Sequence, residues 1–141
     1  MLVPLAEAAY AALAPTPEDT ILNLYGGVGI HAALLAAHVR WVSIADNRAS
    51  DLADAEINLD DLENVDFIEG DPANIVAEVG ADYSAALIDS PAEGLPALLI
   101  DALAASPLAR VVVISDDPAL LARDGKRLAA QGFRLGTVQP L

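Results

Sequence analysis

This chain of 141 residues is long enough for one domain with a buried core, and its 55% hydrophobic content excludes a disordered chain. It contains no cysteine, which excludes disulfides, thiolate metal sites and a cysteine nucleophile. Its formal net charge of −14 disfavours nucleic acid as a partner, because affinity for a phosphate backbone rests on lysine and arginine. We expect this domain alone to bind RNA or DNA weakly or not at all.

Predicted helices and strands alternate from the start of the chain. The pattern predicts a helix over residues 5–13, a strand over 20–25, a helix over 30–39, a strand over 41–45, a helix over 48–58 and a strand over 65–68. Asp71 and Pro72 then have the pattern of a helix N-cap followed by proline at the first helical position.

The alternation continues to the end. We predict a strand over 84–88, a helix over 96–104, a strand over 110–114, a helix from 117 to about 130, and a last strand over 133–138. The apolar, β-branched run at 110–114 predicts a central strand buried on both faces. This order predicts a single domain over residues 1–141, an α/β fold with a doubly wound, mostly parallel sheet that binds ligands at the carboxyl ends of its strands.

A glycine-rich turn, Asn23-Leu24-Tyr25-Gly26-Gly27-Val28-Gly29, joins the first predicted strand to the next helix. Glycines let a backbone approach a nucleotide-like ligand closely, and Gly27–Ala32 fits the dinucleotide pattern G-x-G-x-x-A. Asp46 ends the second strand, as a ribose-binding acid does. From this turn alone, an NAD-binding domain is an open interpretation. Further acids end the next strands, namely Asp71, Asp89 and Asp116, although aspartate is also a common helix cap.

Several segments carry a family resemblance in the right order, namely residues 22–29, 62–71, 87–94, 113–124 and 133–140. From about Leu5 onward the sequence resembles the catalytic domain of the S-adenosylmethionine-dependent RNA 5-methyluridine methyltransferases, a class I methyltransferase family. The resemblance implies a Rossmann-like fold that binds S-adenosylmethionine or S-adenosylhomocysteine. It implies that Gly27 and Gly29 pass close to the methionine portion, that Asp46 binds the ribose hydroxyls and that Asp71 approaches the adenine amino group. The whole implied cofactor-binding set is Asn23, Tyr25, Gly27, Gly29, Asp46, Asp71 and Asp89.

The chain departs from that family at positions that carry its chemistry. Asn23 replaces an acid, Gly26 replaces a cysteine, and Ala92 replaces an arginine. Asp116 replaces the nucleophilic cysteine, and a carboxylate is a far weaker nucleophile toward uracil C6 than a thiolate is. The family's glutamate base falls after the position of Leu141. We therefore expect a degenerate domain that does not form 5-methyluridine by itself.

Whether the chain is an enzyme stays open at this point. Asp89 and Asp116 are the candidate catalytic residues, as bases for direct methyl transfer to a substrate that is not a nucleic acid. We expect no metal site, because His31 and His38 lie seven apart on one predicted helix and are interpreted as packing or solvated side chains. Arg123 and Asp124 match the family pattern but are equally consistent with a surface charge pair.

The resemblance also implies an edge effect in the sheet. Such folds insert a final antiparallel strand beside the fifth strand, and we expect this fold to lack it. Either the predicted strand at 133–138 pairs directly with 110–114, or an open edge favours a homodimer or a missing partner strand. No secretory signal or membrane-spanning segment is recognisable, so we expect a cytoplasmic protein with no membrane partner.

Overall fold

A five-stranded parallel sheet forms the centre of the computed structural model, which describes residues 2–140. The strands are β1 (Thr20–Leu24), β2 (Trp41–Asp46), β3 (Val65–Glu69), β4 (Ala85–Asp89) and β5 (Arg110–Ile114). Their order in the sheet is β3-β2-β1-β4-β5, and every pairing is parallel. This confirms the predicted doubly wound α/β fold. The described helices are all too short or too polar to cross a membrane.

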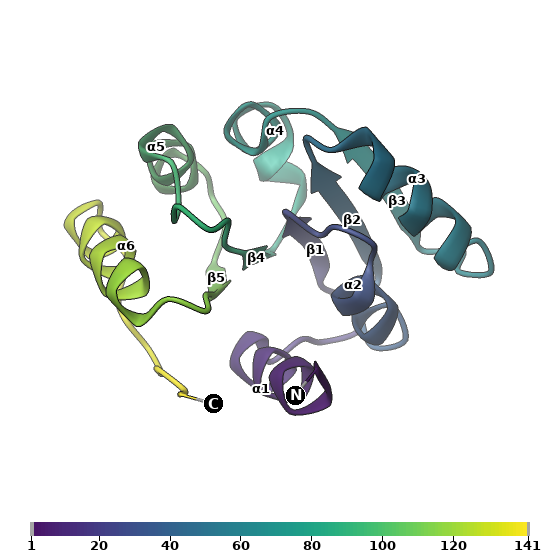
Figure 1. The fold of residues 1–141 in the computed structure, drawn as a ribbon, viewed down its shortest axis with the longest axis horizontal. Helices are drawn as coiled ribbons and strands as arrows, with labels where there is room; N and C mark the ends of the chain where they lie inside the picture. Colours follow the sequence, from purple (N-terminus) through teal and green to yellow (C-terminus); the bar gives the residue numbers. More distant parts are fainter. Residues whose placement is uncertain (1, 141) are drawn as a thin grey trace.

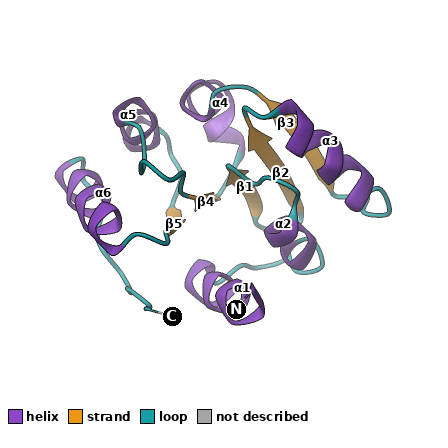
Figure 2. Ribbon diagram, in the orientation of Figure 1, coloured by secondary structure: helices purple, strands orange, loops and turns teal. Residues whose placement is uncertain are grey.

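Helices cover both faces of the sheet (Figures 1 and 2). One face carries α1 (Leu2–Leu13), α2 (Ile30–Leu35) and α3 (Ala49–Asn58). The other carries α4 (Pro72–Val79), which runs into the short 3-10 helix η1 (Gly80–Asp82), and then α5 (Ala97–Ala105) and α6 (Pro118–Ala130). All six helices were predicted, with ends that differ by a few residues.

The two-residue period of the strands divides the core into two clusters. Ile21, Ile44 and Leu87 are fully or almost fully buried against α1, α2 and α3, whereas Leu22 and Ile88 are buried against α4 and α5. Side chains two positions apart on a strand lie on the same face. The polar residues that follow Ile21, Ile44 and Leu87 by two, which are Asn23, Asp46 and Asp89, therefore all lie on the α1–α3 face.

Two predictions at the end of the chain are wrong. The strand at 110–114 is not central, because β5 pairs only with β4 within residues 2–140 and its side chains are only half-buried. Residues 133–138 do not form a strand; they have no regular structure and are mostly exposed. A strand needs a ladder partner, and no described segment pairs with the outer edge of β5, so the open edge is the alternative that the structure adopts.

The helix after the glycine turn is shorter than predicted. It ends at Leu35 rather than at residue 39. The side-chain amide of Asn64, just before β3, donates to the carbonyls of Ala36 and Val39, at 2.7 and 3.3 Å. These bonds satisfy carbonyls that a longer helix would have paired internally, so the chain turns directly into β2.

Candidate functional site

The glycine turn reverses the chain between β1 and α2 through three residues in the left-handed region. The φ angles are +56° at Tyr25, +57° at Gly27 and +93° at Gly29. The φ of +93° favours glycine at position 29, and a Cβ there would also press against the end of the Leu59 side chain, at 2.7 Å from Cδ1. A Cβ on Gly27 would meet no atom within 4 Å. Gly27 is therefore the point of the turn where the backbone is open to a ligand.

Asp46 holds the turn in place. Its side chain is fully buried, and Oδ2 accepts a hydrogen bond from the Gly27 N–H at 3.0 Å. Oδ1 accepts from the backbone N–H of Arg48 at 3.0 Å and lies 3.5 Å from the Arg48 Nε. The Arg48 side chain is 64% exposed, and its Nε also pairs with Asp51 Oδ2 at 3.0 Å, so Arg48 keeps an ion pair when it moves away from Asp46. The carboxylate has acceptor capacity left, but a ribose would reach it only after Arg48 or the turn shifts.

Asn23 lies directly beneath the same turn. It is fully buried, and its Nδ2 donates to the Leu87 carbonyl on β4 at 3.1 Å. Among the described residues its Oδ1 has no hydrogen-bond partner. A Cβ on Gly26 would lie 2.8 Å from that oxygen and 2.7 Å from Ile44 Cγ2. A side chain at position 26 would therefore contact Asn23, so the two residues that depart from the pattern of the resembled family are neighbours in the fold.

Three carboxylates act on Tyr25 through their charge. Burial, together with the negative charges of Asp71, Glu93 and Asp46, raises the pKa of Tyr25 to about 12. Asp71 occupies the N-cap position of α4 with Pro72 after it, but its carboxylate makes no capping hydrogen bond and is exposed. The Asp71 carboxylate is thus free for another partner. Sequence reasoning missed Glu93, since nothing in its exposed loop marks it as facing the turn.

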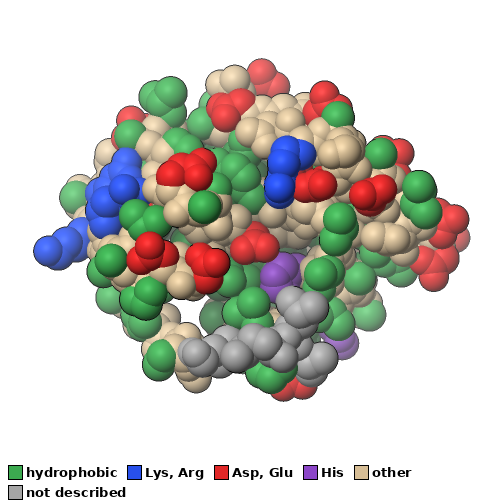
Figure 3. Space-filling view, viewed as in Figure 1, with side chains coloured by type: hydrophobic (Ala, Val, Ile, Leu, Met, Phe, Trp, Pro, Cys, Tyr) green, Lys and Arg blue, Asp and Glu red, His purple; other side chains and the backbone are tan. Residues whose placement is uncertain are grey.

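Asp89 and His31 lie together at the carboxyl end of β4. His31, in the first turn of α2, lines a small cavity with Leu87 of β4 and Tyr10 of α1, and Asp89 follows Leu87 by two on the same face. Figure 3 shows a histidine beside carboxylates near the middle of the visible face. The interpretation of His31 as a packing or solvated histidine missed this neighbour. Its position directly after the glycine turn was the available signal.

The two groups affect each other's titration. Asp89 keeps solvent contact, yet desolvation by the surrounding protein raises its pKa; His31 opposes this rise, whereas nearby Asp116 adds to it. Burial lowers the pKa of His31, and Asp89 partly offsets that effect. His31 is therefore held toward its neutral form next to a carboxylate. The described residues contain no group of three or more histidines and acids placed to hold a metal ion.

A buried carboxylate fixes the loop that follows Asp89. Asp124 on α6 is 2% exposed, and its Oδ2 accepts from the Leu95 backbone N–H at 2.8 Å. Its Oδ1 accepts from Arg123 and Arg127, each at 3.0 Å. The interpretation of Arg123 and Asp124 as a surface charge pair is therefore wrong for Asp124, whose burial depends on a loop about thirty residues away, a contact that only the tertiary fold creates.

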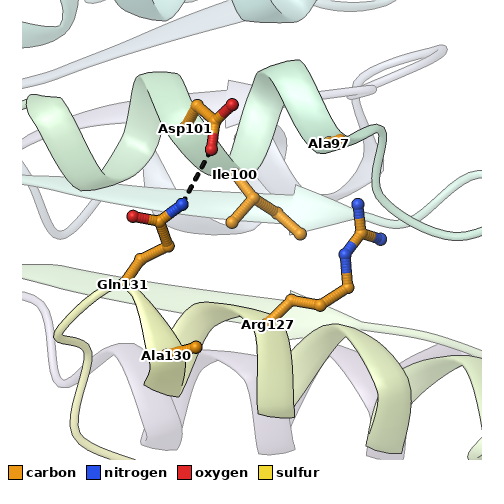
Figure 4. Close-up of a pocket in the computed structure, with 6 residues that line it drawn as sticks. All are labelled: Ala97, Ile100, Asp101, Arg127, Ala130 and Gln131. Atoms are coloured by element: carbon orange, nitrogen blue, oxygen red, sulfur yellow. Dashed lines mark hydrogen bonds between the residues drawn. The ribbon is translucent and has the colours of Figure 1, made fainter.

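Another cavity, of about 330 Å³, lies between the outer helices α5 and α6 (Figure 4). Its lining residues are Ala97, Ile100, Asp101, Arg127, Ala130 and Gln131, with a hydrogen bond of 2.8 Å from Gln131 to Asp101 across it. It lies on the α4–α6 side, whereas Asn23, Asp46 and Asp89 lie on the α1–α3 face. This cavity is therefore not part of the candidate site at the glycine turn.

Comparisons with known proteins find several that are similar to this chain. No family model matches the chain. An uncharacterised RNA methyltransferase of Chlorobaculum tepidum is 35% identical over 133 residues, which cover 89% of this chain and 28% of the relative. A 23S rRNA (uracil(1939)-C(5))-methyltransferase of Pseudomonas putida is 33% identical over 134 residues, covering 92% and 29%. The chain is homologous to RNA methyltransferases over most of its length.

The structural comparison agrees with this relationship. The Pyrococcus abyssi tRNA (uracil-54, C5)-methyltransferase, solved in complex with S-adenosyl-L-homocysteine, superposes with a TM-score of 0.76 at 23% identity, covering 89% of this chain and 31% of that one. The protein thus has the Rossmann-like fold of the methyltransferases. This RNA-methyltransferase-like domain spans less than a third of the length of these relatives.

Proposed function

We propose that this chain is an S-adenosylmethionine-binding, methyltransferase-like domain that does not by itself form 5-methyluridine. The observation that carries the proposal is the glycine turn, in which Gly27 has open space at its Cα and donates its N–H to the buried Asp46, close to Tyr25, on which the charges of Asp71 and Glu93 act. When bound, S-adenosylmethionine supplies an electrophilic methyl group. A cationic cofactor suits an acidic site better than a dinucleotide with a pyrophosphate does.

The residues of the turn suit different parts of that cofactor. The backbone at Gly27 would pass beside the methionine portion, and Asp46 would accept from the ribose hydroxyls once Arg48 moves aside. Asp71, whose carboxylate is not used as a cap, would accept from the adenine amino group. Asn23 and Tyr25 support the turn from below and from the side, and the unpartnered Asn23 Oδ1 has capacity for one donor near Gly26.

The same site argues against uracil methylation by these residues. Asp116 is exposed and stands in the position of the family's nucleophile, where attack on uracil C6 needs a soft thiolate. Its neighbour Asp89 adds a second negative charge. Two carboxylates facing an incoming RNA strand repel its phosphates, and the net charge of −14 extends that repulsion over the whole domain.

Calorimetric titration with S-adenosylhomocysteine tests the cofactor proposal, with NAD as the control ligand. Asp71→Ala is the most informative variant, because its carboxylate makes no capping bond, so the fold is expected to survive its loss. We expect it to weaken S-adenosylhomocysteine binding by about tenfold, the equivalent of one charge-assisted hydrogen bond. Glu78→Ala, which removes an exposed acid near the other end of α4, is the matched control and leaves the affinity unchanged.

Two outcomes would contradict the proposal. Binding of NAD but not of S-adenosylhomocysteine would make this a dinucleotide-binding domain. Binding of neither ligand by the folded protein would leave an interaction role without a cofactor. Asp46→Ala is a less clean test, since Asp46 also holds the Gly27 N–H and its loss disturbs the turn itself.

A further inference from the structure

We propose that His31 and Asp89 form the methyl-acceptor part of this site, and that the acceptor is a primary amine that arrives as an ammonium ion. The inference rests on the cofactor site proposed above and names the substrate class of that site. It assigns to His31 a catalytic role, as the base that takes a proton from the acceptor nitrogen. It assigns to Asp89 the binding of the ammonium group.

The geometry places both groups next to the cofactor turn. His31 follows Gly29 by two residues, and it lines a small cavity together with Leu87 of β4 and with Ala6, Ala9 and Tyr10 of α1. Asp89 is the next residue along β4 on that face, and the β4–β5 register pairs it with Ile114, two residues before Asp116. His31, Asp89 and Asp116 therefore line one stretch of the sheet edge, directly beside the turn.

The charges around this stretch select a cation. The negative charges of Asp116 and Asp46 act on Asp89, and among the described residues Arg48 is the one lysine or arginine that opposes them there. Along the chain, Arg48 is also the one lysine or arginine between Asp46 and Glu93. A group of carboxylates raises the local concentration of cations and lowers that of phosphates. An ammonium ion fits this field, whereas a neutral alcohol gains nothing from it.

An ammonium ion has no lone pair and must lose a proton before it can react. Burial keeps His31 largely neutral near pH 7, so it can accept that proton. The nitrogen lone pair then forms a bond to the methyl carbon of the cofactor. The carbon–sulfur bond breaks, and its electron pair stays on sulfur as S-adenosylhomocysteine. The product is a methylated ammonium ion, and His31 returns its proton to water.

The proximity of the two groups is testable without turnover. In proton NMR, the ring signal lost in His31→Gln identifies His31, and its pKa is followed by pH titration. We expect Asp89→Asn to lower the pKa of His31 further, because the carboxylate partly offsets the effect of burial. Tyr10 is the other titratable group that lines the His31 cavity, and it is kept in every variant, so that any change in the pKa of His31 comes from the substitution at Asp89. An unchanged pKa of His31 in Asp89→Asn would overturn the pairing.

The chemistry is tested with primary amines from n-butylamine to spermidine, with 1-butanol as the matched alcohol, and S-adenosylhomocysteine release as the readout. We expect methylation of amines but not of the alcohol, and a loss of about 100-fold or more in kcat for His31→Gln with unchanged S-adenosylhomocysteine affinity. The acidic limb of the rate–pH profile should follow the pKa of His31. Arg40→Gln, at an exposed residue beyond the end of α2, is the control with unchanged rate.

The outcomes separate this inference from the proposed function. If S-adenosylhomocysteine binds but no amine is methylated, the acceptor assignment is wrong and the cofactor site stands. If amines are methylated equally well by His31→Gln, His31 is not the base. If S-adenosylhomocysteine does not bind, both the cofactor site and the acceptor assignment fail.

Discussion

At the scale of single residues, Asn23 and Gly26 determine how the glycine turn sits on the sheet. A side chain at position 26 would overlap Asn23 Oδ1 and Ile44 Cγ2. The φ angle at Gly26 is not positive, so the conflict is one of packing rather than backbone strain. We predict that Gly26→Cys, which restores the family's residue, lowers the free energy of unfolding by about 1–3 kcal/mol through overpacking, measured by urea denaturation.

A double-mutant cycle checks this explanation. In an Asn23→Ala background the polar conflict is gone, so the cost of Gly26→Cys should fall by about 1 kcal/mol, since residues in contact do not give additive effects. Gly125→Ala is the matched control: a Cβ there meets no atom within 4 Å in the middle of α6, and the change should stabilise by up to about 1 kcal/mol. Equal costs of Gly26→Cys in both backgrounds would place the conflict at Ile44 alone.

The candidate site residues fall into two groups, according to whether their neighbours in the sequence identify them. Gly27, Gly29, Asp46 and Asp71 are candidate residues that the strand–turn–helix pattern of neighbouring residues predicts, together with the family resemblance. His31, Glu93 and Asp124 could not, because their partners come from other strands and helices. Burial and charge at these positions are products of the tertiary fold, and no spacing along the chain encodes them.

At the scale of elements, two aspartates anchor α6 in different ways, one at its N-cap and one in the middle of the helix. Asp117 accepts from the backbone N–H groups of Ala119 and Leu120, at 2.9 and 3.2 Å, and so caps the N-terminus of α6. Asp124 instead joins α6 to the loop after β4 through Leu95. We predict that Asp117→Ala lowers the free energy of unfolding by about 1 kcal/mol. Asp124→Asn should cost about 2 kcal/mol, because its bonds involve charged partners and lie in a buried site.

Hydrogen exchange distinguishes these two roles. Asp124→Asn should speed amide exchange at residues 93–95 beyond its effect on global stability, since the loop loses the carboxylate that pairs with both arginines. Asp117→Ala should speed exchange only in the first turn of α6. Equal exchange in the loop of both variants would mean that Asp124 stabilises the helix and does not position the loop.

Helices and strands could be predicted where residues close together in the sequence determine them. Apolar runs bounded by caps, prolines and glycines predicted all five observed strands and all six helices of residues 2–140. The two failures concern pairing. The residues at 110–114 look like a central strand and those at 133–138 like a last strand, yet whether an apolar run lies inside a sheet depends on its neighbours in space.

At the scale of the whole molecule, the open edge of β5 and the net charge of −14 act against each other. The Ile114 carbonyl accepts from the Ser90 N–H on the β4 side, so the backbone groups of the preceding residue, Val113, point outward along the free edge. Such an edge can pair with a second copy of the chain. We propose that it does so in solution, and that charge repulsion between the two copies makes this association depend strongly on salt.

Sedimentation velocity at micromolar protein tests this, at about 50 mM and about 500 mM NaCl, across which the Debye length falls severalfold. We expect monomers at low salt and a growing dimer fraction at high salt. Val113→Pro removes an outward N–H without breaking the ladder to β4, and it should suppress the dimer. Val138→Lys, at an exposed residue outside β5, adds a charge but leaves the edge intact, so it should dimerise at high salt. A monomer at both salt concentrations would mean that the edge does not pair with a second copy.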